Sequence, residues 1–146
     1  MSVRLSSRPL VPSAAYRELE DPTLGGVVLF AGRVRADPTE SGTVRALLYE
    51  THRGPALRVM EELETEVKRR FGAGRAVVWH RVGRVRVGEI AVIVGAACGH
   101  REPAFEATRY LIEQLKRTVP VWKEARARPV RPRPRRRLRR RARSTG

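Results

Sequence analysis

Residues 90–118, IAVIVGAACGHREPAFEATRYLIEQLKRT, decide the fold class of this chain. The run at 90–98 has no charged side chain, which predicts a central strand that is covered on both faces. Proline is tolerated in a first helical turn, so Pro103 predicts a helix over 103–118. The stripe of this helix that is expected to face the sheet consists of Phe105, Thr108, Leu111, Ile112 and Leu115. A buried strand that leads into an amphipathic helix indicates mixed α and β structure.

The residues before this stretch predict the rest of one domain. Strands are predicted over 27–35, 44–50 and 76–82, and helices over 12–20 and 54–71. Gly72 and Gly74 are expected to end the second of these helices. Residues 36–42 have the composition of a loop, and residues 84–87 alternate basic with apolar side chains.

The chain has 146 residues and a formal net charge of +16, which is unevenly distributed. Residues 126–143 contain 11 arginines and no acidic residue. Like charges repel and little apolar surface is available there, so 126–146 is predicted to be a disordered tail after a domain at 1–125. High basicity favours a nucleic-acid binder, but most of the charge lies in this tail.

Composition excludes several classes of protein and site. The single cysteine, Cys98, forms no internal disulfide and favours a reducing, cytoplasmic location. No apolar run reaches the roughly 20 residues of a membrane-spanning helix, and the first residues lack a signal peptide's apolar core. Three histidines and one cysteine without ligand spacing predict no metal and no cofactor. His52 and His80 are expected to be structural or surface residues, and Cys98 a core residue.

Three groups of basic residues could carry chemistry. His100 and Arg101 lie at a predicted helix start, where unpaired N–H groups favour an anion such as phosphate or carboxylate. The alternative is a capped helix with two surface side chains. Arg33 and Arg35 fall on one face of a strand end, where they could clamp a phosphate or simply be exposed.

The third group is Lys116 and Lys123, which flank the apolar segment VPVW. An ammonium group near apolar surface has a lowered pKa and could act as a general acid or base. The alternative is that the lysines only interact favourably with a helix end in solvent. Trp122 is expected to be a packing residue.

Taken in order, GGVVLFAGRVR, VRALLYE and VVWHRVGRVRVGEIAVIVGAACGHREPAFEATRYLIEQLKRTVPVWKEA resemble the catalytic, large subunit of molybdopterin synthase over about residues 3–125. The most specific part is HR before a helix and K…P.WK after it. The resemblance implies an α+β, α/β-hammerhead fold with a mixed, largely antiparallel sheet. It also implies a homodimer of this subunit with one small ubiquitin-like sulfur-carrier subunit at each end, a heterotetramer overall.

The resemblance implies a sulfurtransferase that acts in molybdenum cofactor biosynthesis. The carrier's thiocarboxylated C-terminus would donate sulfur to cyclic pyranopterin monophosphate (precursor Z), forming the dithiolene of molybdopterin. Lys116 and Lys123 match the essential lysines of the family. The positions that match its substrate-binding residues are Arg33, Val34, Arg35, His100, Arg101, Lys116, Lys123, Glu124 and Ala125.

This sequence departs from the family pattern at two places. Residues 36–39, ADPT, replace an Asn-His-Asn-like loop, and Ala125 stands where relatives commonly carry glutamate, with Glu124 one position earlier. Two other functions stay open: a nucleic-acid binder that acts through its tail, and a non-catalytic partner of a ubiquitin-like carrier.

Overall fold

The computed structural model of the chain describes residues 3–40, 42–118 and 122–124. Its helices are α1 (Pro12–Glu18), α2 (Arg53–Phe71) and α3 (Arg101–Arg117). Its strands are β1 (Val3–Ser6), β2 (Gly26–Arg33), β3 (Pro38–Thr39), β4 (Gly42–Thr43), β5 (Ala46–Thr51), β6 (Arg75–Arg81), β7 (Gly83–Arg86), β8 (Ile90–Cys98) and β9 (Trp122–Glu124). The predicted α+β class is confirmed.

The main sheet has four strands in the order β1-β6-β8-β2. β1 runs parallel to β6, whereas β8 is antiparallel to both β6 and β2. β8 therefore has a strand on each side, as its uncharged sequence predicts. β2 lies at one edge of this sheet, which becomes important for the candidate site.

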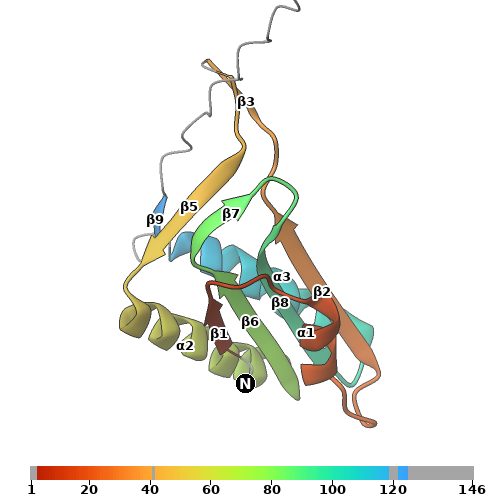
Figure 1. The fold of residues 1–146 in the computed structure, drawn as a ribbon. Coiled ribbons are helices and arrows are strands. Elements are labelled where there is room, and N and C mark those ends of the chain that lie inside the picture. Colours follow the sequence, from red (N-terminus) through yellow and green to blue (C-terminus); the bar gives the residue numbers. More distant parts are fainter. Residues whose placement is uncertain (1–2, 41, 119–121, 125–146) are drawn as a thin grey trace, which may run out of the picture.

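Helices cover both faces of the main sheet (Figure 1). On one face, α2 and α3 bury Met60 and Leu111 against Val94 of β8. On the other face, Leu19, which follows α1 as its C-cap residue, packs against Trp79 of β6. Removing one such side chain from water contributes about 1.5–3 kcal/mol to folding. The two cores fix the sheet and hold α3 in place along β8 and β2.

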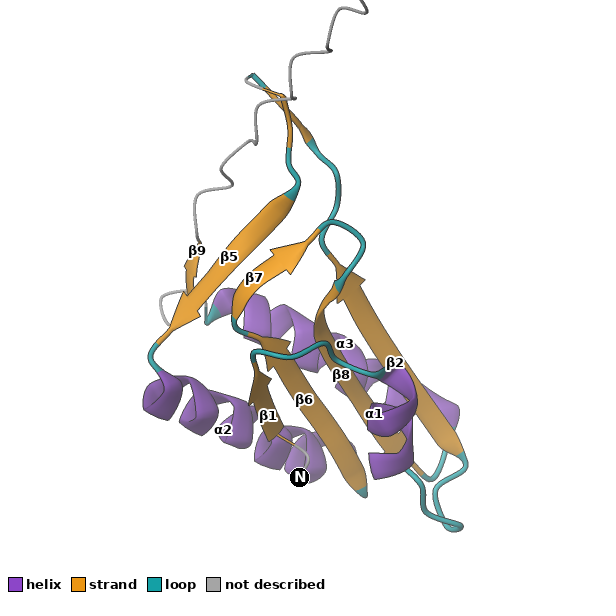
Figure 2. Ribbon diagram, in the orientation of Figure 1, coloured by secondary structure: helices purple, strands orange, loops and turns teal. Residues whose placement is uncertain are grey.

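A smaller antiparallel sheet, β7-β5-β9, stands beside the main sheet (Figure 2). Tyr49 of β5 meets His80 of β6 edge-on, with ring centroids 5.0 Å apart and an interplanar angle of 73°. Since the two rings come from different sheets, their contact joins the small sheet to the main sheet. β3 and β4 form a short hairpin that overlaps the predicted loop at 36–42 and extends one residue beyond it, to Thr43.

The predicted contact stripe of α3 is wrong at Phe105, whose residue surface is 61% exposed. The buried positions of the helix are Ala104, Ala107, Thr108, Leu111 and Leu115. Small alanines allow the helix backbone to approach the sheet closely, and a pattern search that weights large apolar residues misses them. Gly72 ends α2 with a φ of 65°, as predicted, because glycine adopts this left-handed conformation without a steric cost.

The sequence analysis did not predict β1 and β9. Both strands are short, and each depends on a partner that is distant in the chain, β6 for β1 and β5 for β9. Among the described residues, no helix is both long and apolar enough to cross a membrane. The predicted tail at 126–146 lies outside the described residues, so the division into domain and tail stays a prediction.

Candidate active site

His100 and Arg101 lie at the N-terminus of α3, directly after the central strand. His100 is the N-cap residue, with extended backbone angles and no side-chain cap hydrogen bond. Together with Gly25, Gly99 and Glu102, these two residues line a shallow surface hollow. Both basic side chains are exposed, and the uncapped N–H groups of the first turn point in the same direction as the helix dipole. This end of α3 can therefore hold an anion, although Glu102 offsets part of the charge.

The triplet at 33–35 lies where β2 ends. Val34 is 4% exposed and packs in a small core with Val85 and Ala91. Arg33 and Arg35 face solvent, and Arg35 forms an ion pair with Asp37 at 3.3 Å. The predicted alternation of the triplet is confirmed. Because the Val34 side chain is buried, the two arginines are the groups of the triplet that a solute can reach.

The predicted lysines lie on different elements. Lys116 is exposed in the last turn of α3, next to the exposed Arg117. Lys123 is in β9, where the register places it opposite Glu50 of β5. Glu124 lies opposite Tyr49 in the same pairing. Ala125 lies outside the described residues.

Within one chain, these basic groups do not form one cluster. Lys116 lies fifteen positions after Arg101 along α3, so about 22 Å of helix lies between them. β2 begins opposite Cys98, beside the start of α3, and reaches Arg33 at its far end. α3 returns along this strand, and the hydroxyl of Thr108 donates to the carbonyl of Val28 at 3.3 Å. Arg33 and Lys116 therefore lie toward one end of the molecule, and His100 and Arg101 lie at the other.

The remaining candidate groups have structural roles. His80 is 9% exposed, and its Nδ1 bonds the carbonyl of Arg81 at 2.6 Å. Burial lowers the pKa of His80 to about 4, which keeps the ring neutral at pH 7. Cys98 is 1% exposed, and burial raises the pKa of its thiol. His52 is an exposed N-cap residue, as expected for a surface histidine.

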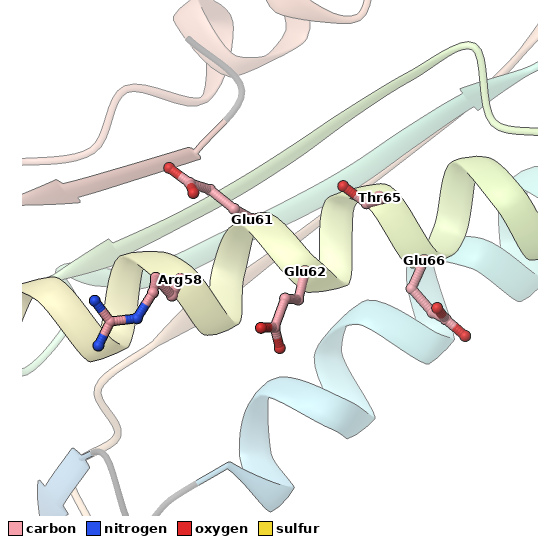
Figure 3. Close-up of a pocket in the computed structure, with 5 residues that line it drawn as sticks. All are labelled: Arg58, Glu61, Glu62, Thr65 and Glu66. Atoms are coloured by element: carbon pink, nitrogen blue, oxygen red, sulfur yellow. The ribbon is translucent and has the colours of Figure 1, made fainter.

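No group of three or more histidine, cysteine and acidic side chains that could hold a metal occurs in the described part of the chain. A second hollow lies on the outer side of α2 and is lined by Arg58, Glu61, Glu62, Thr65 and Glu66 (Figure 3). Its three carboxylates give it the wrong charge for an anionic substrate. This hollow is therefore not the site that the basic residues form.

Arg81 and Glu89, which lie next to the triplet, belong to no motif of the sequence. Arg81 is 5% exposed, and its Nη1 donates to Oε2 of Glu89 at 3.2 Å. The arginine at the end of the apolar strand VVWHR could have indicated a buried ion pair, because a buried charge needs a partner of opposite charge. The partner itself follows from the folded turn and not from the sequence pattern.

Comparison with known proteins bears on this arrangement. The profile of a family described as "MoaE protein" matches residues 5–118. The molybdopterin synthase catalytic subunit of Pyrococcus abyssi is 39% identical over 99 residues, which are 68% of this chain and 66% of that protein. The corresponding subunit of Nostoc sp. is 36% identical over 124 residues, which are 84% of this chain and 74% of that protein.

Two solved structures show the same fold. Molybdopterin synthase from Staphylococcus aureus matches with a TM-score of 0.73 and 24% identity, over 77% of this chain and 81% of that chain. The complex of subunits 1 and 2 of the molybdopterin-converting factor from Helicobacter pylori matches with a TM-score of 0.67 and 18% identity, over 80% and 78%. The fold implied by the sequence resemblance is therefore confirmed. With a family profile that spans most of the chain and relatives above 30% identity, this chain belongs to the MoaE family of molybdopterin synthase catalytic subunits.

Proposed function

We propose that this chain transfers sulfur from the thiocarboxylated C-terminus of a small ubiquitin-like carrier to cyclic pyranopterin monophosphate, forming the dithiolene of molybdopterin. The observation that carries the proposal is a set of exposed basic side chains on a chain whose one cysteine is buried. The Cys98 thiol has a raised pKa and no access to solvent, so it is a poor nucleophile. The sulfur then comes from the partner, and this chain holds anions and handles protons.

The proposed reaction needs two anion sites, and these lie toward the two ends of α3. Arg33 and Arg35 suit a phosphate, which two guanidinium groups can bind with several parallel hydrogen bonds. His100 and Arg101 supply a second anion site at a helix N-terminus. Each transfer forms a carbon–sulfur bond on the substrate in place of a carbon–oxygen bond, whose oxygen leaves with a proton or with the phosphate, and hydrolysis of the carrier's acyl–sulfur bond then releases the carrier as a carboxylate. Lys116, assisted by Lys123, is the proposed proton donor and acceptor for these steps.

Val34, Glu124 and Ala125 complete the proposed substrate-binding set. Contact between the substrate and Val34 is restricted, because both backbone polar groups of Val34 are already bonded. Its N–H donates to the carbonyl of Glu89, and its carbonyl accepts from the N–H of Gly88. The carrier is the partner of this subunit in the proposal, in keeping with the two-subunit Helicobacter pylori complex. The cytoplasmic location and the separate tail at 126–146 belong to the same proposal.

A homodimer would bring the two ends of α3 together. β2 is an edge strand, and Phe30 on it is 40% exposed. Phe30 shares a strand face with Val28, to whose carbonyl α3 is bonded, and Phe105 of α3 is 61% exposed. An open strand edge with exposed aromatic side chains favours association with another chain.

The direction of β2 determines which residues of the two copies such an association would bring close to one another. In a pair whose two-fold axis is perpendicular to β2, the β2 strands of the two copies run antiparallel. The start of one strand, beside His100 and Arg101, then lies near the end of the other strand, which carries Arg33. Since Lys116 lies toward that same end, each complete site would contain residues of both copies.

The proposed role of Lys116 is tested by replacing it with alanine. Lys116→Ala should abolish molybdopterin formation from purified thiocarboxylated carrier and precursor, since no other described α3 residue supplies its ammonium group. Arg117→Ala is the matched control, because Arg117 is the next residue and is equally exposed in the last turn. It should stay close to wild type. Near-normal turnover by the Lys116 variant would rule out the assignment.

A further inference from the structure

Arg33 still pairs with Ile90 at the end of β2, and beyond it the triplet 33–35 is held by the turn between β7 and β8. The β2–β8 register shifts between Gly32 and Arg33, and the ladder ends at the first residue of the triplet, with the pair Arg33–Ile90. From there the N–H of Val34 donates to the carbonyl of Glu89 at 3.1 Å. The N–H of Gly88 donates back to the carbonyl of Val34 at 2.9 Å. The position of this turn therefore sets the position of the triplet's backbone.

The carboxylate of Glu89 stabilises this β7–β8 turn. Its Oε2 accepts from Nη1 of Arg81 at 3.2 Å and from the backbone N–H of Arg86 at 3.4 Å. The side chain of Arg81 is only 6% exposed, and its Nη2 donates to the carbonyls of Ser7 and Arg84, each at 3.4 Å. One buried guanidinium thus connects the segment after β1, strand β7 and the turn. Such a group requires a nearby anion, and Glu89 supplies it.

We propose that Glu89, anchored by Arg81, is a positioning residue that directs Arg33 and Arg35 toward a shared phosphate. Neighbouring side chains on a strand leave it in directions fixed by the backbone, so a rotation of Val34 moves both guanidinium groups. Two arginines bind one phosphate well only when both keep their geometry. This inference rests on the proposed function, because it assumes that Arg33 and Arg35 bind the substrate.

Glu89→Ala in the full chain tests the inference with two readouts. In hydrogen exchange, the amides of Val34 and Gly88 should exchange about tenfold faster, because the turn opens more often. With thiocarboxylated carrier and precursor, the KM for the precursor should rise about tenfold while kcat changes by less than about threefold. Glu89→Gln, which keeps an oxygen that can accept from Arg86, should show smaller changes in both readouts.

Glu66→Ala is the matched control. It removes a glutamate that pairs with Arg69 at 2.8 Å and Arg70 at 3.7 Å on α2, away from the triplet. Neither exchange at Val34 nor the KM should change in this variant. A general loss of stability would instead affect amides throughout the sheet, which the same exchange data would reveal.

A combined variant separates this inference from the proposed function. Arg33→Ala with Arg35→Ala should raise the KM, and adding Glu89→Ala to that pair should raise it no further, because Glu89 acts through the arginines. Unchanged exchange at Val34 in Glu89→Ala would overturn the positioning role whatever the kinetics. Faster exchange with an unchanged KM would also overturn it, while the effect of the arginine pair would leave the proposed function standing. No effect of the arginine pair would overturn both.

Discussion

His80 is a buried histidine at the contact between the two sheets, and its protonation opposes folding. Burial lowers its pKa from 6.5 to about 4, while its bond to the carbonyl of Arg81 acts in the opposite direction. The folded chain therefore binds a proton at His80 less readily than the unfolded chain does. The contribution of this pKa difference to the free energy of unfolding is fully present above about pH 6.5 and is lost as the pH falls toward 4.

Replacing His80 with glutamine should flatten the dependence of stability on pH. The difference between the two pKa values corresponds to about 3 kcal/mol, most of which is lost by pH 4.5. Urea unfolding at pH 7 and pH 4.5 should show a fall in the free energy of unfolding that is about 2 kcal/mol smaller in His80→Gln than in wild type.

His52→Gln is the control for this measurement, because His52 is exposed and should leave the wild-type slope unchanged. If His80→Gln kept the full wild-type dependence, other groups would account for the acid sensitivity of the fold. Sequence reasoning predicted only that His80 is structural or a surface residue. The choice between these depended on Tyr49, which reaches the ring from another sheet.

At the level of elements, the start of α3 is fixed by close backbone contact with the start of β2. A Cβ atom on Gly26 would lie 2.5 Å from the carbonyl carbon and oxygen of His100 and 2.8 Å from the backbone nitrogen of Arg101. All three are backbone atoms, so no side-chain rotation relieves the clash. Only glycine allows this approach, which sets the direction of the proposed anion site.

Gly26→Ala should therefore destabilise the fold and displace His100 and Arg101. Overpacking of this kind costs about 1–3 kcal/mol, so Tm should fall by roughly 5–10 °C in a thermal unfolding experiment. Gly99→Ala is the matched control, since a Cβ there meets no atom within 4 Å. Equal Tm values for the two variants would mean that the β2–α3 contact is not tight.

The same elements show how far local pattern predicts structure. The existence of α3 followed from its helical period, but its start at Arg101 did not, because proline is tolerated throughout a first turn and Pro103 marks no single position. Phe105 was placed in the core because large apolar residues dominate the pattern, whereas close packing favours Ala104 and Ala107. β9 could not be predicted, since three residues carry no period and β5 supplies the pairing.

At the level of the whole molecule, the sequence identified the basic residues but not their grouping. Residue type and local position suggested the anion-binding roles of His100 and Arg101. The apolar segment between Lys116 and Lys123 suggested a general acid or base, a role that the family resemblance then matched. In the structure α3 runs unbroken from Arg101 to Arg117, so Lys116 lies about 22 Å along the helix from Arg101. A site that needs both of its ends must then draw on a second copy.

The proposed composite site predicts complementation between two inactive variants. One copy carries His100→Ala and Arg101→Ala, and the other carries Lys116→Ala. Co-expressed with different tags and purified as the mixed dimer, they should recover up to about half of wild-type activity, because one of the two sites is then assembled only from unchanged residues. Each variant alone should be inactive in molybdopterin formation.

A mixed dimer in which one copy carries all of the substitutions should give the opposite result. When one copy is wild type and the other carries all three changes, every site drawn from two copies lacks either Lys116 or the pair His100 and Arg101. Such a dimer should be inactive, whereas sites contained within one chain would leave it about half of the wild-type activity. Activity in this dimer, together with none in the complementing dimer, would place each site within a single chain. The two mixed dimers carry the same three substitutions in total, so a difference between them reports only how those substitutions are divided between the copies.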